Sequence, residues 1–216
     1  MIIDFWSDVV CPWCFIGKRR LEKAIEKFEF RDEIIVRHRA FELSPDSKEV
    51  MPTSQLLAQK YRISPDDVKA MQANVCAIAD GEGLCYALDE TLSGNTFDAH
   101  RLLLWAATLE KQNELLEAMY SNYFEKSLPL FSHQDLCFVA ESVGIAADEV
   151  MKILDSDLYA QEVIVDRKMA SELGATGVPF FVVDMKYAIS GAQPLEAFIE
   201  TLSTAWRERG SALHSQ

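Results

Sequence analysis

The sequence predicts an α/β fold in which a β-α-β unit and a C-terminal strand–strand–helix segment are separated by a long run of helices. Three observations support this prediction. Apolar stretches at 2–6 and 34–43 flank a helical pattern at 12–28. Helix-start signals then recur from about Thr53 to Leu154. Apolar stretches of strand length return only near the C-terminus, before a last helical pattern.

The N-terminal unit begins with a buried strand at 2–6. Pro12 suits the first turn of the following helix, where its missing N–H costs nothing. The second strand, 34–43, ends at Ser44-Pro45-Asp46. A β-α-β unit this short implies parallel strands joined by a right-handed crossover.

The middle of the chain is predicted to be helical throughout. Ser64-Pro65-Asp66-Asp67 is a helix start with Pro at the first position and acids in the first turn. Asn95, as a cap, opens another helix, and Ser132-His133-Gln134-Asp135 opens one that Gly144 ends. The richest apolar run, 102–107, is far shorter than the roughly 20 residues of a membrane span.

The C-terminal segment starts with a long helix closed by Gly174. Strands at 180–183 and 187–189 follow, and the last helix begins at Pro194. The apolar face of the long helix is predicted to consist of Leu158, Val165, Met169 and Leu173.

Composition excludes several classes of function. With 21 basic and 34 acidic residues the formal net charge is −13, which disfavours nucleic acid and anionic membranes as partners. The N-terminus carries Asp4 and Asp8 and no basic leader, so we expect a cytoplasmic protein. The five cysteines, an odd number with irregular spacing, do not resemble a secreted disulfide framework.

Cys11-Pro12-Trp13-Cys14 lies between the first strand and the first helix. At this junction the helix N-terminus stabilises a thiolate on Cys11, while Cys14 falls on the apolar face of the helix. An exposed attacking sulfur and a shielded resolving sulfur suit redox chemistry. The alternative, half of a zinc site, lacks a second Cys-x-x-Cys or a nearby His pair, so no metal is expected.

The local sequences resemble a known family. Residues 4–6 resemble thioredoxin, and 176–183 resemble the C-terminal half of DsbA. Residues 7–18, 41–45 and 95–101 resemble the FrnE-like branch, which is related to kappa-class glutathione transferases and 2-hydroxychromene-2-carboxylate isomerase. The sequence is thus identified as similar to DsbA-like thioredoxin-fold oxidoreductases.

The resemblance implies a thioredoxin fold with a large all-helical insertion. We expect residues 1–48 and 157–210 to form a discontinuous thioredoxin-like domain and 49–156 to form the inserted subdomain. It also implies a cis peptide bond at Val178-Pro179, which would expose the backbone of Val178 for strand-like pairing with a substrate.

The implied activity is thiol–disulfide exchange by Cys11 and Cys14 on a protein or small-molecule disulfide or dithiol. No cofactor is expected beyond the redox-active disulfide, with glutathione as a candidate co-substrate.

Pro12 and Trp13 are expected to set the reduction potential of the Cys11–Cys14 pair, since the uncharged Trp13 replaces the His that DsbA-like oxidants often use there. Asp4 is either a buried proton acceptor for the resolving cysteine or a solvated strand-end residue. His100 either contacts substrate and tunes Cys11 or is a packing residue, and Asp8 is assigned only to shaping the loop.

Two other functions are open at this stage. A glutathione-dependent isomerase or transferase shares the fold but usually has Ser at the position of Cys11. A binding or chaperone-like module would tolerate loss of Cys11. Cys76 and Cys85 are either a second disulfide or small buried hydrophobic residues, and the sequence leaves the oligomeric state open.

Overall fold

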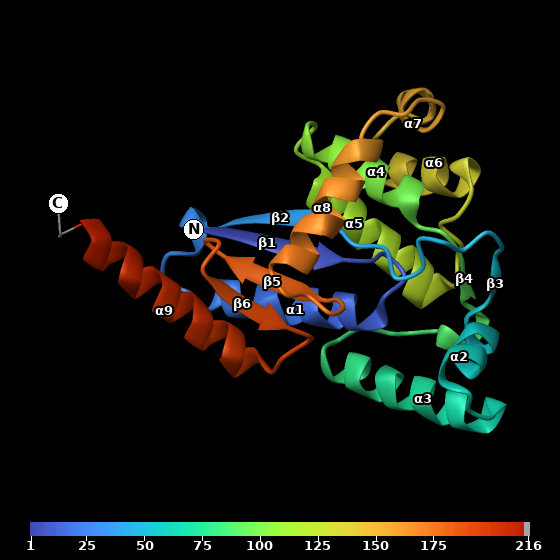
Figure 1. Cartoon of the computed structure of the whole chain (residues 1–216), viewed down its shortest axis with the longest axis horizontal. Coiled ribbons are helices and arrows are strands. Elements are labelled where there is room, and N and C mark those ends of the chain that lie inside the picture. The colour runs from blue at the N-terminus through green and yellow to red at the C-terminus, as the bar shows by residue number, and fades with distance from the viewer. Residues whose placement is uncertain (214–216) are drawn as a thin grey trace.

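The computed structural model describes residues 1–213, with side chains through residue 209. This part of the chain forms a four-stranded mixed sheet and nine α-helices, most of them gathered beyond one end of the sheet (Figure 1). It is a DsbA-like thioredoxin fold with a helical insertion, as predicted.

The sheet has the strand order β2-β1-β5-β6. Strands β1 (Ile2–Ser7) and β2 (Ile35–Ala40) are parallel and are connected by helix α1 (Pro12–Glu26). Strand β5 (Phe180–Val183) runs antiparallel to β1, and β6 (Tyr187–Ser190) runs antiparallel to β5. This arrangement confirms the predicted parallel unit.

The predicted second strand is too long at its C-terminal end. It ends at Ala40 rather than Leu43. The backbone N–H of Leu43 donates to Oδ2 of Asp8, 2.7 Å away, instead of to a neighbouring strand. The chain therefore leaves the sheet here and passes beside the loop that carries the cysteines.

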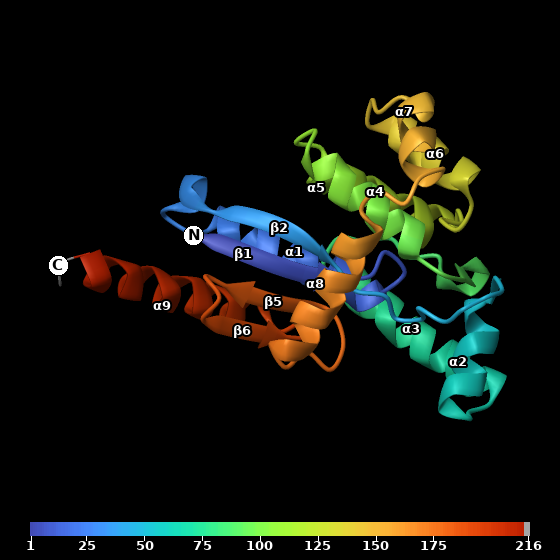
Figure 2. The same ribbon diagram turned by 45° about the horizontal axis from the view of Figure 1, so that its top comes forward.

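The two faces of the sheet are covered by different helices, as Figures 1 and 2 show together. Helices α1 and α9 (Leu195–Leu213) pack on one face and α8 (Ala160–Glu172) on the other. Ile3 and Phe5 belong to the core shared with α1, and Trp6 packs toward α8. Trp6 Nε1–H donates to the carbonyl of Asp166 at 2.8 Å, which anchors α8.

The inward face of α8 agrees only in part with the prediction. Met169 and Leu173 are partly buried and pack on the core beside Trp6, as predicted, whereas Leu158 and Val165 are about half exposed. The fully buried residues are Val163, Asp166 and Ala170, so one buried position is occupied by a carboxylate that the apolar pattern does not mark. The carboxylate of Asp166 is compensated, since it accepts from the backbone N–H of residue 40 at 3.0 Å and pairs with an arginine of β2.

Helices α2 to α7 lie between β2 and α8 in the chain. The predicted starts at Ser64 and Ser132 are confirmed, and each serine forms a capping box with the aspartate three residues later. The insertion is not entirely helical, because two-residue strands β3 and β4 pair antiparallel within it. The elements of this region are α2 (Thr53–Tyr61), α3 (Pro65–Gly81), α4 (Phe97–Ala107), α5 (Gln112–Tyr120), α6 (His133–Ser142), α7 (Ala147–Leu154), β3 (Met51–Pro52), β4 (Leu92–Ser93) and a π-helical turn at Ser121–Glu125.

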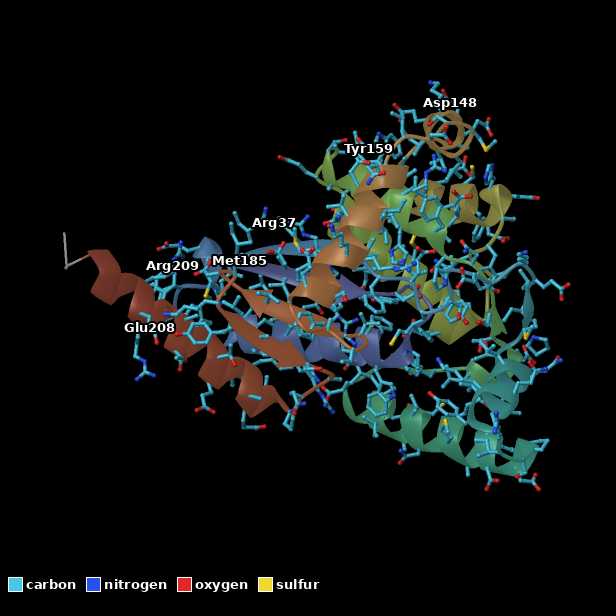
Figure 3. All side chains as sticks on the ribbon, viewed as in Figure 1. Arg37, Asp148, Tyr159, Met185, Glu208 and Arg209 are labelled. Carbon is cyan, nitrogen blue, oxygen red and sulfur yellow. The ribbon has the colours of Figure 1, made fainter. Side chains whose placement is uncertain are left out.

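Helix α9 extends past the sheet at the end opposite the insertion (Figure 1). Glu208 and Arg209 lie beside Met185 of the β5–β6 turn (Figure 3). Arg209 pairs with Asp184 at 3.3 Å, which ties the helix to this turn. None of the helices within the described residues has the length and apolar character needed to cross a bilayer.

Candidate active site

Cys11 and Cys14 lie where β1 passes into α1. Cys11 is the N-cap residue, and Pro12 occupies the first helical position. The backbone N–H of Cys11 donates to the carbonyl of Asp8 at 3.1 Å, and that of Cys14 donates to the carbonyl of Cys11 at 2.9 Å. These turns bring the two cysteines to 3.2 Å of each other, and both are free thiols. Cys11 therefore sits at the positive end of the helix dipole.

The two sulfurs have different surroundings. Cys14 is fully buried. Cys11, predicted from the sequence to be exposed, is also buried, at 4% exposed, but it lines a pocket. Burial, together with a hydrogen bond and charge from Cys11, raises the pKa of Cys14 well above its usual value. Cys14 therefore holds its proton more strongly than an ordinary thiol, and Cys11 is the cysteine that borders the pocket.

The segment before β5 closes over Cys11. The Val178-Pro179 peptide bond is cis, and Sγ of Cys11 donates to the carbonyl of Val178 at 3.6 Å. Gly17 on α1 permits this approach, because a Cβ there would lie 3.0 Å from Cγ of Pro179 and 3.2 Å from Cζ of Phe181. The structure thus brings Val178 and Pro179 to the cysteines.

A pocket of about 340 Å³ opens beside Cys11, between the cysteine loop, the Val178 segment and helices α2 and α3. Apolar and aromatic side chains dominate it, and Lys60 is its basic residue. The apolar and aromatic lining residues are Val10, Pro12, Trp13, Leu43, Leu56, Leu57, Tyr61, Met71, Val75, Leu88, Tyr123, Phe124 and Val178. A pocket with this lining is of the kind that suits an apolar group.

The start of α1 is held by aromatic residues of the insertion. The hydroxyl of Tyr86 donates a hydrogen bond to the carbonyl of Pro12 at 2.8 Å. Phe15 stacks on Tyr120 with 4.9 Å between ring centroids. The Tyr120 hydroxyl donates to Oγ of Ser7 at 2.9 Å. The cysteine loop is thereby fixed from the side of the insertion.

The structure does not bring Asp4 to the cysteines. Asp4 is buried, but its Oδ1 lies 2.8 Å from Nε of Arg39, which also pairs with Asp166 of α8. Asp4 alternates with Ile3 and Phe5, whose side chains join the core that contains Cys14. It therefore belongs to an ion-pair network on the opposite face of the sheet.

Sequence reasoning assigned Asp8 only to the loop and missed that it is a buried acid next to the cysteine turn. Its carbonyl accepts from the backbone N–H of Cys11, and its Oδ1 is 3.4 Å from Nε2 of His100. The ring of His100 stacks on that of His38, with 5.7 Å between centroids and 6° between planes. The signal for Asp8 was its place three residues before Cys11, whereas no local pattern marks His38.

The remaining candidates are placed as follows. Asn95 acts as a cap, since its Oδ1 accepts from the backbone N–H of Phe97 at 2.8 Å. Cys76 and Cys85 are both free thiols, and Cys85 is exposed. Among residues 1–213, no group of three or more His, Cys, Asp or Glu side chains is arranged to hold a metal ion.

Comparison with known proteins agrees with this architecture. The model of the DSBA-like thioredoxin domain matches residues 2–203. The structure of a probable DsbA oxidoreductase from Streptomyces coelicolor is 42% identical, with a TM-score of 0.93 over 96% of this chain and 91% of that one. No curated protein sequence matches the chain.

More distant structures share the fold alone. 2-Hydroxychromene-2-carboxylate isomerase is 15% identical, with a TM-score of 0.70 over 98% of this chain and 99% of that one. The cytosolic disulfide reductase DsbM from Pseudomonas aeruginosa with GSH is 16% identical, with a TM-score of 0.67 over 96% of this chain and all of that one. The family match spans nearly the whole sequence, and the chain therefore belongs to the DsbA-like thioredoxin domain family.

Proposed function

We propose that this protein is a thiol–disulfide oxidoreductase in which Cys11 is the nucleophile and Cys14 the resolving thiol. The observation that carries the proposal is the asymmetric pair itself. Two thiols lie 3.2 Å apart, one at a helix N-terminus facing a pocket and the other buried behind it. A thiolate at the first position and a protonated thiol at the second are what sequential exchange requires.

The proposed reduction proceeds in two exchanges. The Cys11 thiolate attacks a substrate disulfide, forming a Cys11–substrate disulfide and releasing one substrate thiolate, which takes up a proton. Cys14 then loses its proton and attacks Sγ of Cys11. The Cys11–Cys14 bond forms, the Cys11–substrate bond breaks, and the second substrate thiolate is protonated. The substrate gains two electrons and the dithiol loses them, while the reverse sequence oxidises a dithiol.

We propose that Val178 and Pro179 position the substrate. The Val178 carbonyl already accepts from Cys11, so its backbone lies where an extended substrate segment would pair beside the sulfur. The apolar pocket next to Cys11 favours a disulfide flanked by an apolar or aromatic group. In this proposal two molecules of glutathione return the Cys11–Cys14 disulfide to the dithiol and leave as glutathione disulfide.

The direction of the reaction depends on Trp13. The indole of Trp13 carries no charge that would stabilise a thiolate on Cys11. We therefore place the reduction potential of the Cys11–Cys14 pair toward the reducing end of the family's range. The likeness to a cytosolic disulfide reductase supports this direction.

A second candidate is a glutathione-dependent isomerase acting on a small molecule. The apolar pocket beside Cys11 and the shared fold of 2-hydroxychromene-2-carboxylate isomerase favour it. In that reaction glutathione would supply the thiol, and Cys14 would have no role. The two candidates therefore differ in what they require of Cys14.

Substituting the cysteines one at a time tests the proposal. With a disulfide-bonded peptide as substrate, Cys14→Ser is expected to accumulate the Cys11–substrate disulfide, detectable by mass spectrometry, and to lose turnover. Cys11→Ser is expected to form no adduct. Full turnover by Cys14→Ser would rule out the dithiol mechanism and favour the glutathione-linked candidate.

A further inference from the structure

The pocket beside Cys11 differs in charge from the rest of the protein. None of the 21 residues that line it is acidic, and Lys60 is the basic residue among them. In the whole chain, by contrast, 34 acidic residues outnumber 21 basic ones. The pocket therefore has a cation and no carboxylate in its wall, although the protein as a whole is acidic. Such a wall favours an anionic ligand over a cationic one.

Helix α2 forms one wall of this pocket. Its lining residues are Thr53, Leu56, Leu57, Lys60 and Tyr61, whose spacing places them on a single face of the helix. The helix lies on the outside of the molecule beside α3 (Figures 1 and 2), and none of its residues is fully buried. The apolar face of α2 is therefore presented to the pocket and not to a closed core.

The pocket leads from a buried sulfur to an exposed mouth. Cys11 is 4% exposed, whereas Tyr61 is 52% exposed and Lys60 is exposed as well. The ammonium group of Lys60 lies 5.9 Å from the centroid of the Tyr61 ring. A ligand whose sulfur reaches Cys11 therefore extends along apolar side chains toward the ammonium group of Lys60.

Lys60 has no carboxylate partner within the protein. The four basic residues in the middle of α1 each pair with at least one glutamate. No acidic side chain among residues 1–209 forms an ion pair with Lys60. The ammonium group of a lysine attracts a carboxylate as a point charge, and apolar surroundings strengthen this attraction. The charge of Lys60 is thus available to a ligand in the pocket.

We propose that the substrate is a disulfide in which one half has an apolar or aromatic body that carries a carboxylate, and that Lys60 binds this carboxylate; the proposal rests on the dithiol function above. Cys11 attacks the sulfur of that half and forms a disulfide with it, while the other half leaves as a thiolate and is protonated. Cys14 then releases the bound half as the second thiol. Lys60 takes no part in the exchange and determines which disulfide is preferred.

The test compares two aromatic disulfides. One is 5,5′-dithiobis(2-nitrobenzoate), which has a carboxylate on each half, and the other is 4,4′-dithiodipyridine, which is uncharged at about pH 7. The rate constant for thiol release from the reduced protein is measured with each disulfide by absorbance. The double variant Cys11→Ser, Cys14→Ser gives the contribution of the other three cysteines, which is subtracted. The ratio of the two rate constants, anionic over neutral, cancels any change in the reactivity of Cys11 itself.

Substitution of Lys60 is expected to lower this ratio. Lys60→Met removes the attraction, and the ratio should fall about threefold, within the range for a partly exposed ion pair. Lys60→Glu replaces the attraction by a repulsion of similar size, so the fall should be about tenfold. Both effects should shrink at about 1 M salt, which screens exposed charges.

Lys69 provides the matched control. It is an exposed residue of α3 that does not line the pocket. Lys69→Met and Lys69→Glu change the net charge of the protein by the same amounts and should leave the ratio unchanged. An equal fall in the Lys60 and Lys69 variants would show that only the overall charge matters and would overturn the proposal.

A pair of disulfide-bonded peptides identifies the source of the carboxylate. The peptides have Phe-Glu or Phe-Gln next to the cysteine and are otherwise identical. If Lys60→Glu also lowers the rate ratio of the Glu peptide to the Gln peptide, an acidic peptide supplies the carboxylate. If it lowers only the ratio for the aromatic disulfides, a small molecule does. If neither ratio falls, the proposal is wrong. Absence of a Cys11–Cys14 disulfide after reaction with every probe would instead overturn the dithiol function on which it rests.

Discussion

The substitution Gly17→Ala is predicted to lower turnover more than it lowers the free energy of unfolding. In Gly17→Ala the new Cβ would lie 3.0 Å from Cγ of Pro179 and 3.2 Å from Cζ of Phe181. Both distances are shorter than an ordinary carbon–carbon contact of about 3.5–4.0 Å. Pro179 is bonded to the Val178 carbonyl group, whose oxygen accepts from Cys11 at 3.6 Å, so a shift of Pro179 displaces that acceptor.

Two opposing effects set the expected stability. Replacing Gly by Ala inside a helix gains about 0.8–1.0 kcal/mol, and overpacking a buried contact costs about 1–3 kcal/mol. The net loss for Gly17→Ala is therefore about 0–2 kcal/mol. For a chain of this size, each kcal/mol lowers the melting temperature by about 2–4 °C.

Turnover is expected to fall by more than stability does. A displacement of a few tenths of an ångström moves Val178 and Pro179 relative to the attacking sulfur, and positioning errors near 1 Å cost about a hundredfold. We expect a roughly three- to tenfold lower kcat/KM with a disulfide peptide, on the same principle. Thermal unfolding of the reduced protein and steady-state turnover measure the two quantities separately.

Gly81 is the matched control. It ends helix α3, and a Cβ there would meet nothing within 4 Å. Gly81→Ala should raise stability by up to about 1 kcal/mol and leave turnover unchanged. If Gly17→Ala were stabilised as much as Gly81→Ala and turned over normally, the argument for a close contact at Pro179 would be refuted.

Three further predictions concern buried or partly buried hydrogen bonds. Tyr120→Phe removes the donor to Ser7 and should lower the free energy of unfolding by about 1–2 kcal/mol. Arg101→Met removes a buried guanidinium that donates to one carbonyl in the last turn of α7 and to two in the segment between α7 and α8, and should cost about 3–5 kcal/mol. For Glu82, burial opposes the shift, but hydrogen bonds from two basic residues of α1 hold its pKa below the usual value of 4.5. Its stabilisation, about 1 kcal/mol or less, is present above about pH 4.5 and lost at lower pH, so Glu82→Gln should reduce the loss of stability between pH 7 and pH 4.

Denaturant unfolding measures all three. An unchanged stability of Tyr120→Phe would show that its hydroxyl does not hold the cysteine loop. A cost below about 1 kcal/mol for Arg101→Met would mean that water replaces the guanidinium at the carbonyls. For Glu82→Gln, an acid sensitivity equal to that of the unsubstituted protein would contradict the assigned ion pairs.

Features encoded by neighbouring residues were predictable from sequence. The cysteine motif, the helix that starts at Pro12 and the serine capping boxes depend on contacts within a few residues. The cis bond at Val178-Pro179 was inferred from family resemblance, because few X-Pro bonds are cis.

Features that depend on which face packs where were not predictable. The alternation of β1 alone cannot tell whether Phe5 or Asp4 faces α1, so sequence reasoning could not see that Asp4 lies on the face away from Cys14. Asp166 faces inward because an arginine from a strand 127 residues away compensates it. Asp8, His38 and His100 come from a loop, a strand and a helix that meet only in the folded protein.

A redox titration tests the central claim most directly. The purified protein is equilibrated in buffers of varied glutathione to glutathione disulfide ratio, and its thiols are trapped and assigned by mass spectrometry. The account predicts one two-electron transition in which the Cys11–Cys14 disulfide forms and disappears as a unit. If only a glutathione adduct on Cys11 appeared at every ratio, with no Cys11–Cys14 disulfide, the dithiol mechanism would be contradicted.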